Sequence, residues 1–234
     1  MKTLVVMPTF NEAQSLESTI EGLLNNLPDV EILVVDDNSK DDTAGIADSL
    51  ALKHNGVSVL HRPAKQGLGP AYIEGFRYAI SNNYELICEM DADGSHQAVD
   101  LSRMLAVAPE ADLVIGSRWI AGGSVQNWPI SRLALSRFGN LYARTMLGTR
   151  IFDMTSGFRV YKAEFLKKLI SSPVSSQGYS FQVELAFRAS KVGIVKEVPI
   201  AFIERAEGKS KMTLAIVIEA LLKIQLWGIK RILS

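Results

Sequence analysis

Short apolar runs alternate with segments of helical periodicity along the first half of the chain. Apolar residues dominate 4–7, 31–35, 57–60, 86–90 and 112–115, a pattern typical of strands that are covered on both faces of a sheet. The segments between them repeat apolar residues at helical spacing, as at Leu16, Ile20, Leu23, Leu24 and Leu27. Strands that alternate with helices predict an α/β fold with a mostly parallel central sheet flanked by helices.

Residues suited to helix starts follow several of these runs. Asn11 with Gln14 forms a capping-box pattern, Asp42 precedes a second helical segment, and Pro70 suits the first position of a third. The second half predicts helices over 130–146, 181–191 and 212–233 and a late strand over 195–202.

The length and composition predict one domain with a C-terminal appendage. A chain of 234 residues with 47% hydrophobic residues buries one substantial core, and it contains no repeat or linker-like segment. We expect a domain over 1–211 and an amphipathic, membrane-interfacial helix over 212–234. Glu219, Lys223 and Lys230 share one helical face there. The alternative is a helix packed on the domain or in a dimer contact.

The sequence favours a protein on the cytoplasmic face of a membrane. The N-terminal apolar run is too short for a signal peptide, and no run of about 18 uncharged apolar residues predicts a spanning helix. Trp227 lies close to Lys230 and Arg231, a combination favoured at lipid headgroups. The single cysteine, Cys88, lies in an apolar run and is expected to be a core residue.

The charges are balanced in total but separated along the chain. There are 25 basic and 25 acidic residues; acidic ones predominate up to residue 112 and basic ones over 118–168. This separation suits a site that holds a cation with one part and phosphates with the other. The alternative is two solvated faces of opposite sign. Nothing in the balance indicates a nucleic-acid partner.

Three polar segments directly follow predicted strands and should meet at one edge of the sheet, where ligands bind in such folds: 8–12, 36–39 and 91–94. In the third, Asp91 and Asp93 can share a cation only if the chain turns, which Gly94 favours. Mg²⁺ or Mn²⁺ would take these carboxylates together with substrate phosphates and water. The alternative is a helix cap with a solvated neighbour.

Other nucleotide and metal motifs are absent from the sequence. No P-loop is present, and Gly67-Leu68-Gly69 lacks the full dinucleotide fingerprint. His54, His61 and His96 have no zinc-ligand spacing. His96 alone lies near the candidate carboxylates.

Five motifs in order, 7–12, 34–39, 90–96, 116–118 and 153–159, give the chain a specific resemblance. They read Met-Pro-Thr-Phe-Asn-Glu, Val-Val-Asp-Asp-Asn-Ser, Met-Asp-Ala-Asp-Gly-Ser-His, Gly-Ser-Arg and Asp-Met-Thr-Ser-Gly-Phe-Arg. The set resembles the inverting glycosyltransferases of family 2, and within them the dolichyl or polyprenyl phosphate mannose synthases. The similarity runs from residue 3 to about 211.

The resemblance implies a GT-A (Rossmann-like) fold, a GDP-mannose donor, a dolichyl or polyprenyl phosphate acceptor, and Mg²⁺ or Mn²⁺. By matching positions, the residues that border the nucleoside are Pro8, Phe10, Glu12, Val35 and Asp37. Those that meet the metal and diphosphate are Asp91, Ala92 and Asp93. The further donor contacts are Arg118, Arg205 and Lys211, and Arg132 matches a basic residue near the reacting phosphates. Ser95 stands where some relatives carry glutamine as a third metal ligand; water or His96 would then complete the shell.

The chemistry of this reaction needs charge stabilisation more than proton transfer. A leaving diphosphate gains negative charge, which a divalent cation and arginines stabilise, whereas an acceptor phosphate is already anionic. We therefore expect Asp91, Asp93, Arg118 and Arg132 to act electrostatically, with no general base. We also expect the segment 204–211 to close over the donor. Two alternatives stay open: a UDP-sugar-dependent glucosyl or other sugar-phosphate synthase, and a non-catalytic nucleotide-binding protein.

Overall fold

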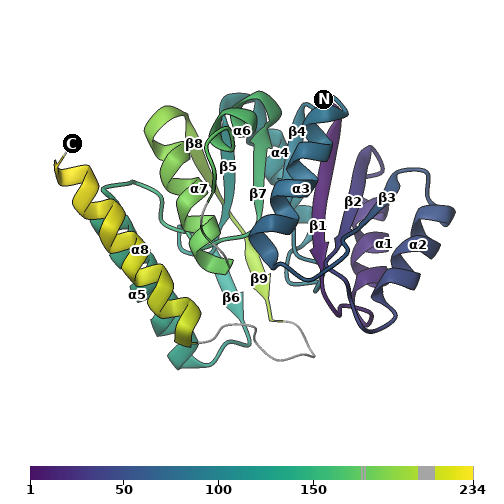
Figure 1. Cartoon of the computed structure of the whole chain (residues 1–234), viewed down its shortest axis with the longest axis horizontal. Coiled ribbons are helices and arrows are strands. Elements are labelled where there is room, and N and C mark those ends of the chain that lie inside the picture. Colours follow the sequence, from purple (N-terminus) through teal and green to yellow (C-terminus); the bar gives the residue numbers. More distant parts are fainter. Residues whose placement is uncertain (175, 177, 205–213, 234) are drawn as a thin grey trace.

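The computed structural model describes residues 1–174, 176, 178–204 and 214–233. Its central sheet has seven strands in the order β3-β2-β1-β4-β7-β5-β8 (Figure 1). Their bounds are β1 Thr3–Thr9, β2 Val30–Asp36, β3 Val57–His61, β4 Leu86–Glu89, β5 Leu113–Ser117, β7 Arg159–Lys162 and β8 Val195–Pro199. A second, two-stranded parallel sheet pairs β6 (Ser124–Gln126) with β9 (Ala201–Ile203).

Helices cover both faces of the central sheet (Figure 1). They are α1 Leu16–Asn26, α2 Thr43–Lys53, α3 Leu68–Ser81, α4 Ala98–Val107, α5 Ile130–Leu147, α6 Ala163–Leu169, α7 Gly178–Val192 and α8 Leu214–Leu233, with a 3₁₀ turn at Ala108–Glu110. Side chains of consecutive strand residues belong to the cores on opposite faces of the sheet. Val5 belongs to the core that includes residues of α1, α2 and α4, and Val6 belongs to the core that includes residues of α3. The predicted α/β architecture with a double-sided sheet is therefore confirmed.

One central strand, β7, runs antiparallel to both of its neighbours and was missing from the prediction. It contains Arg159, which is fully buried and interrupts the apolar pattern. The Arg159 guanidinium donates to the carbonyls of Ser156 at 2.8 Å and Met154 at 2.9 Å. It also donates to the hydroxyl of Tyr161, which in turn donates to Glu89 at 3.0 Å. This network satisfies a charge within the sheet.

Two local predictions were wrong. Asn11 caps no helix: it has φ +56°, its backbone N–H donates to the Ser39 hydroxyl at 3.0 Å, and α1 begins only at Leu16. The predicted late strand over 195–202 is two strands, β8 and β9, which belong to different sheets. The chain leaves the central sheet after Pro199, and from Ala201 it pairs with β6 instead.

The C-terminal helix α8 packs beside α5 and α7 (Figure 1). Ile224 is buried there, and the Trp227 ring stacks on Phe187 with 6.4 Å between centroids. The opposite stripe leaves three apolar side chains exposed: Leu222, Leu226 and Ile229. One side of α8 is thus packed on the domain, as the alternative prediction has it, and the other side keeps an exposed apolar stripe. Within the described part of the chain, no helix is long and apolar enough to cross a membrane.

Candidate active site

The carboxyl ends of β1 and β2 are joined by side-chain hydrogen bonds, as the sequence predicts for segments at one sheet edge. Pro8 pairs with Val35 in the parallel register. The Thr9 hydroxyl donates to Asp36 Oδ1 at 3.1 Å, and Glu12 N–H donates to the Thr43 hydroxyl at 2.8 Å. These contacts place the 8–12 and 36–39 segments next to each other.

The carboxylate of Asp37 organises the loop that follows β3. It accepts hydrogen bonds from the backbone N–H of Gln66 at 3.1 Å and of Gly67 at 2.8 Å, and it forms a buried ion pair with Arg62. Arg62 also donates to the Gln66 side chain at 2.8 Å. The sequence interpretation missed Arg62, because only the fold brings it to Asp37. Asp37 therefore fixes one wall of the site.

The Asp91-Ala92-Asp93 segment leaves the line of β4 in a turn, as its predicted role as a cation site requires. Gly94 has φ +75°, a conformation that favours glycine. The carboxylate of Asp93 accepts the backbone N–H of Ser95 at 3.1 Å, and the Thr19 hydroxyl donates to the Ala92 carbonyl at 3.2 Å. The turn is thus held by Thr19 of α1 at Ala92 and by the backbone of Ser95 at Asp93.

His96 supports this turn from within. Its Nδ1 accepts the backbone N–H of Asp91 at 3.1 Å, and its ring stacks on Phe158 at 4.5 Å. Burial lowers the pKa of His96 to about 4, so the ring is neutral near pH 7. With Nδ1 engaged, His96 positions the Asp91 backbone. The nearby Ser95 hydroxyl is buried and has no hydrogen-bond partner among the described residues.

Arg118 is buried at the end of β5 and holds the loop that precedes β7. Its backbone N–H, at 3.0 Å, and its Nε and Nη2, both at 2.7 Å, donate to the carboxylate of Asp153. Nη2 also donates to the Thr155 hydroxyl at 2.9 Å. Because the guanidinium binds Asp153 in this bidentate way, its role in donor binding stays a prediction. Nothing in the spacing of the two residues along the chain indicates that Asp153 is its partner.

Arg132, in the first turn of α5, forms an ion pair with Glu204 at the end of β9. Its guanidinium lies 4.1 Å from the centroid of the Trp128 ring. The pair joins α5 to the two-stranded sheet. Arg205 and Lys211, the two other expected donor contacts, lie outside the described residues.

An aromatic cluster that the sequence interpretation missed links the turn over residues 91–94, here called the acidic turn, to Arg118 and Arg132. Trp128 contacts Trp119 at 6.3 Å and Phe202 at 5.4 Å, and Phe202 contacts His96 at 5.6 Å between centroids. The Arg118 guanidinium lies 5.5 Å from the ring centroid of each of Trp119, Trp128 and Phe202. The position of Trp119 directly after Arg118 was the one available hint.

The 153–159 motif also reaches the acidic turn. A Cβ placed on Gly157 would lie 3.8 Å from Asp91 Oδ1 and 3.5 Å from Gln182 Nε2. Glu89, the last residue of β4, is fully buried, and burial raises the pKa of its carboxyl to about 7. The carboxyl edge of the sheet therefore combines two half-buried carboxylates, those of Asp91 and Asp93, with arginines held by acidic partners.

The sequence model of glycosyl transferase family 2 matches residues 4–170. The chain belongs to glycosyl transferase family 2. This glycosyltransferase is 46% identical over 230 residues to the undecaprenyl-phosphate mannosyltransferase of Micrococcus luteus, covering 98% of this chain and 95% of the relative. It is 48% identical over 232 residues to the polyprenol monophosphomannose synthase of Mycolicibacterium smegmatis, covering 98% and 88%.

Solved structures show that the glycosyltransferase has the GT-A fold. One is a mannosyltransferase from Pyrobaculum calidifontis in complex with GDP-Man and Mn²⁺, with a TM-score of 0.62 and 18% identity, covering 89% of this chain and 58% of the other. Another is glucosyl-3-phosphoglycerate synthase from Mycobacterium tuberculosis with Mn²⁺, UDP-glucose and phosphoglyceric acid, with a TM-score of 0.70 and 19% identity, covering 96% and 79%.

The acidic turn of the glycosyltransferase carries two carboxylates, those of Asp91 and Asp93. Among the described residues, no cluster of three or more His, Cys, Asp or Glu side chains could hold a metal ion. Mg²⁺ typically takes one or two carboxylates and fills its shell with phosphate oxygens and water. Asp91 and Asp93 fit that chemistry, and the unpartnered Ser95 hydroxyl beside them is a further oxygen.

Proposed function

We propose that the glycosyltransferase moves mannose from GDP-mannose to the phosphate of a polyprenyl or dolichyl lipid. The observation that carries this proposal is the identity of nearly half the residues, over almost the full chain, with two proteins named for mannosyl transfer to lipid phosphates. The site agrees with it, because carboxylates after β4 lie across an aromatic cluster from arginines.

Asp91 and Asp93 would hold Mg²⁺ or Mn²⁺, with Ser95 as the nearest additional oxygen. Both solved relatives cited above are complexes with Mn²⁺ and a nucleotide sugar. A bound divalent cation supplies a positive charge that stabilises the diphosphate as it gains negative charge. Thr19, His96 and Gly94 keep the turn in place for that purpose.

In the proposed reaction an oxygen of the lipid phosphate attacks C1 of mannose. The bond between C1 and the donor diphosphate breaks with inversion, and its electron pair leaves with GDP. No general base is needed because the attacking oxygen is already anionic. Arg132 is the described arginine expected to orient the two phosphates, since guanidinium groups bind phosphate bidentately. Reaching them requires Arg132 to exchange its ion pair with Glu204.

The nucleoside would lie along the wall that Asp37 fixes. Phe10 is placed there with Lys65, whose ammonium lies 3.5 Å from the Phe10 ring centroid. Pro8 and Val35 pair at these strand ends, and Glu12 lies in the loop after β1. All three would border the nucleoside. The buried Asp37–Arg62 pair would keep this wall rigid before the donor arrives.

A donor panel tests the proposed function. The purified protein should be incubated with a polyprenyl phosphate, Mn²⁺ or Mg²⁺, and either GDP-mannose, UDP-glucose or UDP-galactose. We expect sugar in the lipid fraction with GDP-mannose, at a rate at least tenfold above either UDP-sugar. Preferential transfer from a UDP-sugar would replace the proposed donor, and no transfer from any donor would remove the proposed reaction.

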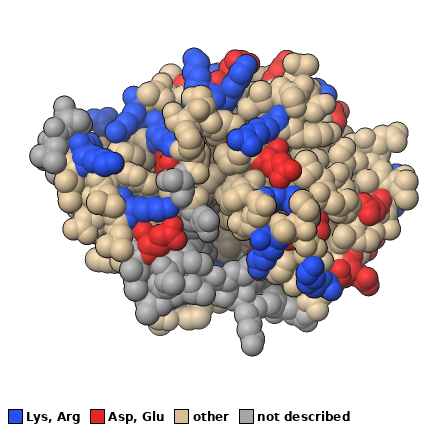
Figure 2. Space-filling view, in the orientation of Figure 1, with Lys and Arg blue, Asp and Glu red and all other residues tan. Residues whose placement is uncertain are grey.

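We further propose that α8 holds the enzyme at the cytoplasmic face of the membrane that contains its acceptor. Its exposed stripe carries Leu222 and Leu226, which are 56% and 58% exposed. Its last turn carries Lys230 and Arg231, and Figure 2 shows mainly Lys and Arg among the charged side chains on that side of the molecule. An apolar stripe beside basic residues is typical of interfacial helices.

Substitution of the stripe is a sharper test than deletion of α8, because deletion would also expose the core that Ile224 and Trp227 cover. The double variant Leu222→Glu/Leu226→Glu should bind liposomes at least tenfold more weakly than the wild type, since two exposed leucines can no longer enter the lipid and two carboxylates face its anionic headgroups. Co-sedimentation with anionic vesicles measures this. Leu52→Glu is the control, because Leu52 is 90% exposed on α2. Equal binding of the double variant would show that the stripe does not meet lipid.

A further inference from the structure

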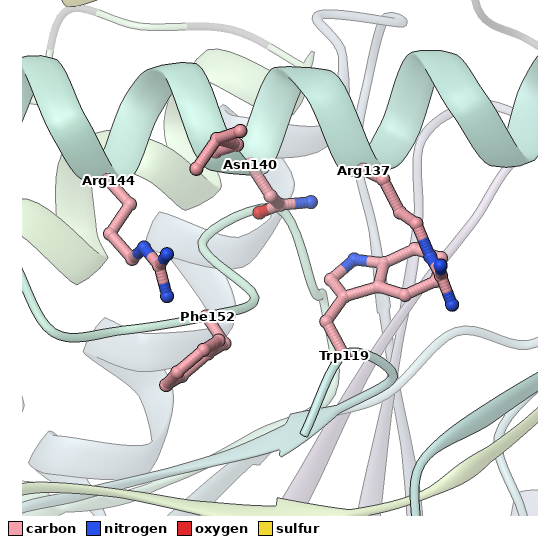
Figure 3. A pocket seen from close by; sticks show the side chains of 6 residues that line it. Trp119, Arg137, Asn140, Arg144 and Phe152 are labelled. Carbon is pink, nitrogen blue, oxygen red and sulfur yellow. The ribbon is translucent and has the colours of Figure 1, made fainter. Parts of the chain in front are cut away.

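A pocket of about 300 Å³ lies between α5 and two loops, one of which carries Trp119, the residue after Arg118. In Figure 3, Arg137 extends from the middle of α5 and Arg144 from its last turn, with Asn140 between them, and Trp119 and Phe152 lie opposite on the loops. Leu141 completes the described lining. The volume is at the lower limit of ligand pockets, which suits a small headgroup better than a nucleotide sugar.

The pocket is lined by N–H donors that have no acceptor among the residues that the structure describes. Arg137 and Arg144 form no hydrogen bond or ion pair through their guanidinium groups with the described residues. Their recorded contacts are with aromatic rings, Arg137 at 5.3 Å from Trp119 and Arg144 at 4.4 Å from Phe152. The indole N–H of Trp119 is buried and also lacks a partner among the described residues. Figure 3 shows this nitrogen on the side of Asn140.

No acidic side chain occurs in the described lining to balance the two arginines. Asp153, which follows Phe152, is fully buried and binds Arg118 with both carboxylate oxygens. Asn140 is satisfied by Thr155 and by the Met154 N–H. The remaining donors therefore favour an anion with several oxygens, since planar guanidinium groups match phosphate geometry.

The rim of the pocket is apolar and open to solvent. Leu141 and Phe152, which line it, are 54% and 46% exposed, and the adjacent Phe138 is exposed as well. A free phosphate ion gains nothing from such a rim, whereas an amphiphile with a phosphate headgroup uses both parts. The pocket also lies on α5, which packs beside α8.

We propose that this pocket binds the phosphate headgroup of an anionic membrane phospholipid that is not the acceptor. Arg137, Arg144 and the Trp119 N–H contact the phosphate oxygens, and Leu141 and Phe152 contact the first part of the lipid chains. A bound headgroup connects α5 to the 149–155 loop, which also holds Arg118 through Asp153. The inference deepens the proposed membrane association, on which it rests for the location of the enzyme.

The test compares the full-length wild type with the double variant Arg137→Gln/Arg144→Gln. Binding is measured to vesicles of phosphatidylcholine alone and to vesicles that also contain phosphatidylglycerol. The double variant should lose about 30-fold in binding to the phosphatidylglycerol vesicles, or about fivefold for each arginine at an anionic surface. Its binding to phosphatidylcholine vesicles should change little. The variant Trp119→Phe, which keeps an aromatic ring but loses the indole N–H together with the five-membered ring, should weaken the same binding.

The control Lys167→Gln/Lys168→Gln removes the same charge from exposed positions on α6, away from the pocket. An equal loss in this control would mean diffuse attraction and would overturn the headgroup site. Binding of inorganic phosphate as tight as that of soluble short-chain phosphatidylglycerol, followed by calorimetry, would also overturn the lipid assignment.

Transfer to a short, water-soluble polyprenyl phosphate without vesicles separates this inference from the proposed function. The arginine double variant should retain wild-type transfer in that assay. Loss of transfer would show that the pocket binds the acceptor and would overturn the inference. If the wild type transferred no mannose but its phosphatidylglycerol binding depended on both arginines, the pocket assignment would stand and the proposed function would fall.

Discussion

Asp93→Ala is expected to reduce mannosyl transfer about a thousandfold, because loss of a cation that stabilises the leaving diphosphate removes several kcal/mol, at about 1.4 kcal/mol for each factor of ten. The Asp93 carboxylate lies in the turn after β4, where Ser95 N–H already orients it. Initial rates with GDP-mannose and a short polyprenyl phosphate at saturating Mn²⁺ measure the effect.

Asp29→Asn is the matched control, since Asp29 is exposed just before β2, at the end of that strand remote from the turn. It should keep the wild-type rate. Circular dichroism and thermal unfolding should show that both variants are folded. Addition of chelator to the wild type should reproduce the Asp93→Ala rate. Full activity in excess chelator would contradict the metal assignment.

Asp153→Asn is expected to lower the free energy of unfolding by about 3–5 kcal/mol, because it leaves the buried Arg118 guanidinium without its counter-charge. Arg118 and Asp153 are both under a tenth exposed and are joined by three hydrogen bonds. For a chain of this length the loss corresponds to a decrease in Tm of about 6–20 °C. Scanning calorimetry measures it directly.

The exposed ion pair between Lys196 and Glu110 provides the comparison. Glu110→Gln should leave Tm close to that of the wild type, since exposed pairs contribute little. If Asp153→Asn unfolded at the wild-type temperature, the 149–155 loop would not depend on Arg118, and the structural role assigned to this pair would be wrong.

The fold was largely predictable because its signals are local. Each parallel strand that the sequence predicts is a short apolar run, and the register places Pro8 opposite Val35 at the expected sheet edge. The strand β7 was not predictable, because an arginine in the sequence indicates a surface position, whereas Arg159 is fully buried. Its charge is satisfied only through carbonyls of the preceding loop and through Tyr161, which binds Glu89 on a strand far back in the chain.

The candidate site was predictable in its acidic half and less so in its basic half. Asp91, Asp93 and Gly94 are adjacent in sequence, so their turn could be inferred from residue types alone. Arg118 and Arg132 were read as phosphate contacts, but their partners Asp153 and Glu204 lie far along the chain, and spacing cannot reveal such pairs. The boundary at residue 211, the metal ligands, and the roles of Arg205 and Lys211 stay predictions.

The chemical structure of the lipid product tests the central claim most directly. Wild-type protein, Mn²⁺, GDP-mannose and a short polyprenyl phosphate should give a mannosyl phosphodiester with one phosphorus atom, the β anomer, and one GDP per lipid. Phosphorus and carbon-coupled proton NMR of the extracted lipid distinguish this product. A lipid diphosphate or a retained α anomer would show that the enzyme breaks a different bond or uses a different stereochemical course, and would contradict the account.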